Sequence, residues 1–151
     1  FMYRDAPPRF ATGPQKDAMR LQLMRHYSPL VLRGKRDSLS VADQGEYHVI
    51  TLFEEGVRAD YFVNSDNWRI EKVVGGLAMH GIEMQFVTEY SNFKVHDGVL
   101  VHQSENKFAG GTNTAKLELR SITLDAKLTE ADFVPDHGKF VQPNQEQDNV
   151  I

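Results

Sequence analysis

Histidine and carboxylate side chains are the groups in this sequence whose types could support chemistry. No two of the six histidines have the i, i+4 spacing that pairs zinc ligands on a helix. Three imidazoles could converge on a metal only if the loops that carry them met in space. The alternative is that they are scattered surface and edge side chains, so we expect no metal and no cofactor. The six are His26, His48, His80, His96, His102 and His137.

Paired carboxylates offer a second chemistry. Glu54 and Glu55 adjoin on a predicted hairpin, and Glu83 and Glu89 lie on the polar side of one predicted strand. Carboxylate catalysis needs two groups a few ångströms apart, one of them with a pKa raised by burial. A solvated strand face meets neither condition. The sequence also lacks a Gly-x-Ser-x-Gly elbow, a phosphate-binding glycine motif and any cysteine, so we expect that the protein is not an enzyme.

The overall composition describes an ordinary folded domain. The chain has 151 residues, of which 40% are apolar and 25% charged. Its net charge of −4 argues against a nucleic-acid partner, because such proteins normally carry a basic stripe. No apolar run approaches the roughly 20 residues that span a bilayer, so we expect no transmembrane segment.

One helix should precede the strands. The segment Thr12-Gly13-Pro14-Gln15 has the form of a capping box with proline in the first turn, which predicts a helix from about 14 to 26 or 28. Pro29 disfavours helical geometry at Ser28, so a break is expected there, followed by one more buried turn over 30–32. The apolar stripe of this helix is Ala18, Leu21, Met24 and Tyr27.

From Tyr47 onward the apolar period changes to two, which indicates strands with one buried and one wet face. An antiparallel meander with one helix on its apolar face follows, an α+β fold. A shift of the apolar set near Ser121 suggests a bulge. The turns are expected at Glu55-Gly56, Asn64–Asn67, Gly75-Gly76, His96-Asp97-Gly98 and Gly110-Gly111.

Methionine and other apolar side chains are plentiful on the predicted helix and sheet. Such side chains fill irregular cores, and they also line adaptable binding surfaces. One interpretation is ordinary core; the other is a groove between helix and sheet that opens to take an acyl chain. The residues expected to line that groove are Leu21, Met24, Tyr61, Met84, Phe86 and Leu117.

Three segments, 69–73, 88–99 and 128–135, resemble the C-terminal half of LolA-like outer-membrane lipoprotein-sorting proteins. The turn Asp97-Gly98-Val99 and the closing pattern of Phe133, any residue and Pro135 carry the resemblance most clearly. It implies a curved antiparallel half-barrel wrapped over helices. It also implies an apolar concavity that holds lipoprotein acyl chains in the periplasm or cell envelope.

The resemblance also implies a domain organisation. Residues 1–135 would form one sheet-and-helix domain that lacks N-terminal elements before Phe1, and residues 136–151 would form a polar tail. A half-barrel without its first strands leaves an unpaired edge, through which a homodimer could form. The leading hypothesis is therefore non-enzymatic binding of a lipid or lipoprotein acyl chain. The alternative is a protein-interaction or self-assembly module that uses the sheet edge without lipid.

Overall fold

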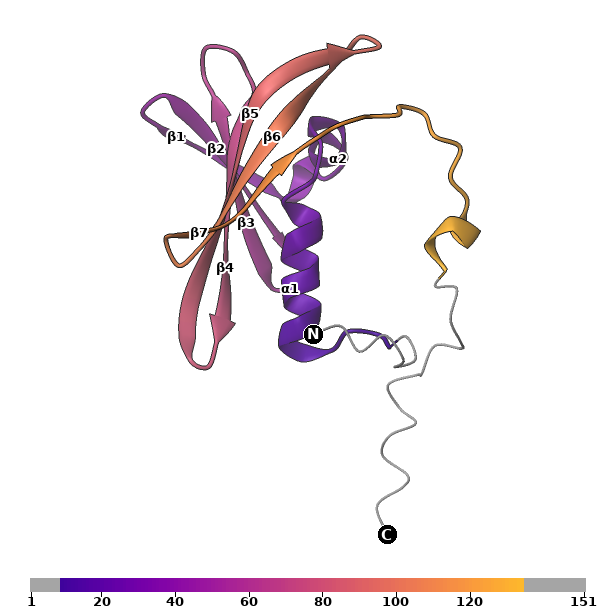
Figure 1. Cartoon of the computed structure of the whole chain (residues 1–151). Helices are drawn as coiled ribbons and strands as arrows, with labels where there is room; N and C mark the ends of the chain where they lie inside the picture. Colours follow the sequence, from indigo (N-terminus) through magenta and orange to yellow (C-terminus); the bar gives the residue numbers. More distant parts are fainter. Residues whose placement is uncertain (1–8, 135–151) are drawn as a thin grey trace.

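The computed structural model describes residues 9–134, in which a seven-stranded antiparallel sheet carries a helix along one face (Figure 1). The strand order is β1-β2-β3-β4-β5-β6-β7, so every strand pairs with its neighbours in sequence. This confirms the predicted α+β meander with one helix packed on it. The predicted polar tail at 136–151 lies outside the described residues. The strands are β1 Leu39–Gln44, β2 Tyr47–Glu54, β3 Val57–Asn64, β4 Ile70–Met79, β5 Ile82–His96, β6 Val99–Ala109 and β7 Thr112–Glu118.

The sheet is neither closed nor strongly curled. The structure therefore supports the predicted α+β fold of an antiparallel sheet with one helix packed on it. It does not show the curvature of a half-barrel. The helix covers β3 and β4, while the long hairpin of β5 and β6 extends beyond it (Figure 1).

The helical segments begin and end close to the predicted positions. They are α1 Gly13–Met24, α2 Pro29–Gly34 and two 3-10 turns, η1 Arg36–Ser38 and η2 Glu130–Phe133. The predicted break is confirmed: the Ser28 side chain accepts a hydrogen bond from the Val31 N–H, and Pro29 begins α2. The predicted capping box is not formed, because the Thr12 side chain makes no capping hydrogen bond. No helix among residues 9–134 has the length and apolar character needed to cross a membrane.

The core lies between α1 and the middle of the sheet. Leu21 and Met24 of α1 pack with Ala59 and Tyr61 of β3 and with Val73 of β4, and all five are almost completely buried. In β3 the residues facing α1 are buried and those between them are half-buried or exposed, as expected for a sheet covered on one face. Burial of each large apolar side chain contributes about 1.5–3 kcal/mol, so this interface fixes α1 on the sheet.

The prediction of a turn at Gly75-Gly76 was wrong, because both glycines lie inside β4. The physical reason is close packing. A Cβ on Gly75 would overlap the Leu21 side chain and lie 3.0 Å from the Arg58 carbonyl oxygen. Gly75 thus allows the Leu21 side chain of α1 to pack directly on the β4 backbone, and the sequence pattern of a glycine pair concealed this role.

Two further differences concern the ends of the sheet. β7 ends at Glu118, so the bulge expected near Ser121 does not exist. The pairing shifts instead between Lys107 and Phe108 on β6, opposite β7. Strand β1 was not predicted, because its sequence Leu39-Ser-Val-Ala-Asp-Gln alternates only weakly in polarity.

Candidate functional site

A pocket of about 470 Å³ opens where α1 ends. Three segments surround it: the junction of α1 and α2, the turn between β3 and β4, and the hairpin of β5 and β6. The volume lies within the range of roughly 300–1,000 Å³ that is usual for small-molecule sites. Much of the wall is apolar, including Leu30, Ile70, Tyr90, Phe93, Val99 and Val101.

Two tyrosines of the sheet hold the end of α1 beside this pocket. The Tyr61 hydroxyl donates to the Met24 carbonyl oxygen at 2.8 Å, and the Tyr90 hydroxyl donates to the Arg25 carbonyl oxygen. Burial raises the pKa of both phenols above their ordinary value, so both stay protonated donors. The two hydroxyls thus anchor the carbonyl groups of the last helical residue and of the residue after it to the sheet, and the Met24 carbonyl also accepts from the Tyr27 N–H at 3.1 Å.

Irregularities in β4 and β5 shape the sheet side of the pocket. β4 has an extra residue where its pairing with β3 shifts, since Val63 pairs with Ile70 but Phe62 pairs with Lys72. In β5, Asn92 has a left-handed φ of 55°. These interruptions occur on two of the three strands that border the pocket, the third being β6.

The left-handed Asn92 changes the alternation of β5. Tyr90 and Phe93 are three residues apart and would face opposite sides of a regular strand, yet both line the pocket. His102 of β6, which pairs with Phe93, has its ring centroid 4.5 Å from that of Tyr90. An asparagine inside an aromatic-rich strand was the available sequence signal for this change, because asparagine tolerates left-handed geometry.

Trp68 stands at the rim of the pocket in a strained conformation. Its φ is +59°, which is unusual for a bulky residue and costs about 1–3 kcal/mol. The turn enforces this conformation: the Trp68 N–H donates to the Asn64 carbonyl at 2.9 Å, and the Asn64 side chain accepts from the Asp66 N–H. The Trp68 ring stacks on His48 and remains 70% exposed. The turn therefore presents an aromatic surface beside the pocket.

The pocket is electropositive. Of the described residues that line it, Arg25, His26, Arg69 and His102 have basic side chains and none is acidic. Arg69 also lies over the Phe93 ring, 5.2 Å from its centroid. A basic, partly apolar cavity is unexpected in a chain of negative net charge.

One buried carboxylate, Glu105 of β6, lies behind the two histidines of the pocket. Its Oε1 is 3.0 Å from His102 Nε2 and 3.5 Å from His26 Nε2. Its Oε2 is 3.3 Å from Lys107 Nζ, an ion pair without hydrogen-bond geometry. Hydrogen bonds from His102 and His26 hold the pKa of Glu105 far below its usual range, and the bond to Glu105 raises the pKa of His26.

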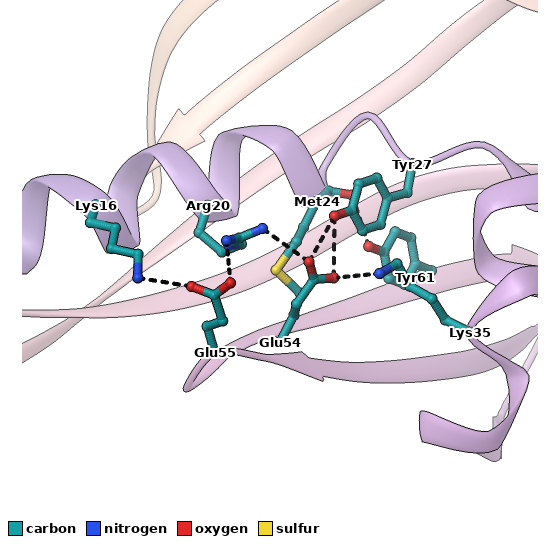
Figure 2. A network of polar contacts seen from close by, with 8 residues as sticks. All are labelled: Lys16, Arg20, Met24, Tyr27, Lys35, Glu54, Glu55 and Tyr61. Atoms are coloured by element: carbon teal, nitrogen blue, oxygen red, sulfur yellow. Dashed lines mark hydrogen bonds and ion pairs between the residues drawn. The ribbon is translucent and has the colours of Figure 1, made fainter. Parts of the chain in front are cut away.

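Two of the four carboxylates considered for catalysis, Glu54 and Glu55, are held in ion pairs (Figure 2). Glu54 contacts Arg20 at 3.0 Å, Lys35 at 3.1 Å and the Tyr27 hydroxyl at 3.1 Å. Glu55 is paired with Arg20 and Lys16, and these partners lower its pKa. A general acid at neutral pH needs a raised pKa. The pair instead ties α1 and α2 to the hairpin of β2 and β3.

The residues expected to line a groove do not lie together. Leu21, Met24 and Tyr61 meet in the filled core. Met84 and Phe86 are half-buried on β5, and Leu117 of β7 is 40% exposed. None of the six lines the pocket. The apolar face of the helix correctly indicated the core between α1 and the sheet, but the pocket begins after the last residue of that face.

The histidines of the described residues do not gather at one place; His26 follows α1, and His137 lies outside the described residues. His80 lies in the turn before β5, and His96 ends β5 at its opposite end. His96 Nε2 lies 3.1 Å from Gln103 Nε2, while His102 faces the pocket. Within residues 9–134 no group of three or more His, Asp or Glu side chains is arranged to hold a metal ion.

Comparison with protein-family models, with curated proteins and with solved structures finds no match for this chain.

Proposed function

We propose that this protein binds an apolar ligand, such as a lipid or lipoprotein acyl chain, and does so without catalysing a reaction. The pocket at the end of α1 carries the proposal. It is of small-molecule size and largely apolar, and it lies next to a helix–sheet interface that is otherwise filled. The ligand would enter past Trp68 and Leu30, whose side chains are exposed at the rim.

The LolA-like resemblance supports the same proposal. Two of the three resembling segments, 69–73 and 88–99, contribute Arg69, Tyr90 and Phe93 to the pocket. Kinship with lipoprotein-sorting proteins, and with it a location in the periplasm or cell envelope, is therefore part of this proposal. Because the sheet is neither closed nor strongly curled, the proposed kinship rests on these segments rather than on a half-barrel.

A neutral fluorescent probe tests ligand binding directly. N-phenyl-1-naphthylamine brightens in apolar surroundings, so a saturable rise at one probe per chain is expected. Val101→Trp, which places a large ring in the pocket, should weaken probe binding about tenfold or more. Val41→Trp on β1 is the matched control, because Val41 is 65% exposed and does not line the pocket. Equal probe binding by the two variants, or none by the wild type, would refute the proposal.

The alternative function is protein interaction or self-assembly through the sheet edge. β1 is an edge strand with five of its six residues exposed, including Val41. Such an edge presents unpaired N–H and C=O groups to another chain. This alternative predicts a concentration-dependent dimer that survives delipidation, which light scattering would detect. A monomer at all concentrations, together with saturable probe binding, favours the ligand-binding function.

A further inference from the structure

We propose that the pocket selects an anionic amphiphile, a single apolar chain with a carboxylate or phosphate head group, and that Arg25 recognises the head. This inference rests on the proposed function and names the ligand class of the same pocket. Its evidence is independent of the apolar lining: it is a buried cation that lacks a counter-ion within the described protein.

The guanidinium of Arg25 is the central observation. The residue is only 9% exposed and lines the pocket. Its Nη1 donates to the Thr88 hydroxyl at 3.1 Å and its Nη2 donates to Gln22, both neutral groups, while its buried Nε has no hydrogen-bond partner. No carboxylate of residues 9–134 forms an ion pair with it, although Glu54, Glu55 and Glu105 all pair with other bases.

A buried charge without a partner is expensive, and proteins rarely retain one without a use. The charge of Glu105 acts on Arg25, but Glu105 already contacts His26, His102 and Lys107. Arg25 and Lys107 together exceed the single charge of Glu105 even when both histidines are neutral. The local excess is therefore positive, and an anion in the pocket would compensate it.

The arrangement of the lining favours an amphiphile over a free anion. Arg25 and His26 follow the end of α1, and Arg69 and His102 lie beside Phe93, whereas Val99 and Val101 continue the wall along the hairpin of β5 and β6. One end of a ligand would meet basic groups while its body met apolar side chains. Arginine suits this role because its planar fork matches the geometry of carboxylate and phosphate oxygens.

The test compares ligands of one chain length by displacement of N-phenyl-1-naphthylamine from the wild-type protein, below the critical micelle concentrations of the charged ligands and below the solubility limit of dodecanol. Dodecanoate and dodecyl phosphate should displace the probe at concentrations about tenfold or more below those of dodecanol and dodecyltrimethylammonium. Equal potency of all four, or greater potency of the cation, would overturn the inference but leave the proposed function standing. Displacement by acetate or inorganic phosphate alone would show a site for free anions and also overturn it. If the probe itself does not bind, the proposed function fails.

Variants assign the preference to Arg25. Arg25→Met should abolish the difference between dodecanoate and dodecanol while leaving dodecanol binding, and Arg25→Lys should keep part of the difference. Arg58→Met is the control, since Arg58 pairs with Asp60 away from the pocket. Should Arg25→Met fail to fold, the wild type still decides: raising NaCl from about 0.05 to about 0.5 M should weaken binding of dodecanoate and not of dodecanol. An unchanged dodecanoate affinity in high salt would contradict the role of charge.

Discussion

Helix α1 and the segment that follows it meet the same sheet in opposite ways. In the last turn of α1, which we call the filled end, Leu21 and Met24 are fully buried, and the absence of a Cβ at Gly75 leaves room for the Leu21 side chain. Beyond Met24 the helix stops, and the sheet opposite it is interrupted by the irregular pairing of β4 and by Asn92 of β5. There, at what we call the open end, a pocket forms instead of a core. Where the apolar face of α1 packs on regularly paired strands, the interface is a filled core. Where the helix has ended and the strands opposite are irregular, a pocket remains.

The charged side chains at the filled end and at the open end also differ in how they are paired. The filled end is bordered by a charge network in which Glu54 and Glu55 are matched by Arg20, Lys16 and Lys35 (Figure 2). The open end has basic side chains in excess. Each base of the first network contacts a carboxylate, whereas Arg25 at the open end has no carboxylate partner among residues 9–134; this difference favours a structural role for the first region and a functional role for the second.

The largest expected effect is on the filled end. Leu21→Ala should lower the free energy of unfolding by about 2–5 kcal/mol, because it deletes a buried side chain that adjacent residues cannot replace. Leu30→Ala removes the same atoms at the rim of the pocket, where Leu30 is 76% exposed, and should change stability by less than about 0.5 kcal/mol. Urea denaturation measures both. A similar decrease in the free energy of unfolding in both variants would contradict the proposed difference between the two regions.

An intermediate effect is expected from the glycine pair in β4. Gly75→Ala should destabilise the protein by about 1–3 kcal/mol, since the new Cβ meets Leu21 and the backbone oxygen of Arg58. Gly76→Ala is a matched control, because its Cβ would meet only the flexible side chain of Glu83. Its loss of stability should be the smaller one. Thermal unfolding of both variants tests the claim, which fails if Gly76→Ala is the more damaging.

The smallest effect is a pH dependence at the open end. The raised pKa of His26 means that its contribution to stability is complete below its ordinary value of 6.5 and is lost as pH rises through the raised value. Its partner Glu105 has a lowered pKa, so that contribution is complete above the ordinary value of 4.5 and is lost only in stronger acid. The pair should therefore stabilise most between about pH 4.5 and 6.5.

Replacing His26 tests this window. The stability difference between the wild type and His26→Gln should be largest in it and should decline above it. We expect less than about 1 kcal/mol, because the His26 side chain is 38% exposed and solvent screens the pair. Denaturation curves at several pH values provide the profile. A difference that grows as pH rises above 6.5 would contradict the ion pair.

Much of the fold could be predicted from the sequence because it depends on local periodicity. The period of two from Tyr47 and the break at Pro29 lead directly to β2, β3 and the junction of α1 and α2. Gly75 was misread because a glycine in a turn and a glycine under a helix look alike in sequence. β1 was missed because a short edge strand with few buried residues has little pattern to read.

The candidate site was harder to predict than the fold. Its residues come from three segments that are distant in sequence, and only tertiary structure brings Arg25, Arg69 and His102 to one cavity. The apolar stripe pointed to Leu21 and Met24 of α1, which are completely buried in the core with residues of the sheet. The spacing of apolar residues identifies side chains that are buried in a core. It does not show where the core ends and a pocket begins.

The most direct test uses the single tryptophan of the sequence, Trp68, as a reporter at the pocket rim. Its fluorescence should be followed while dodecanoate is added below its critical micelle concentration, with acetate as the control that lacks a chain. We expect a saturable blue shift at one ligand per chain, since the exposed indole ring would exchange water for the apolar chain. A spectrum that does not change, or that changes in proportion to ligand without saturation, would contradict a binding site at the open end of α1.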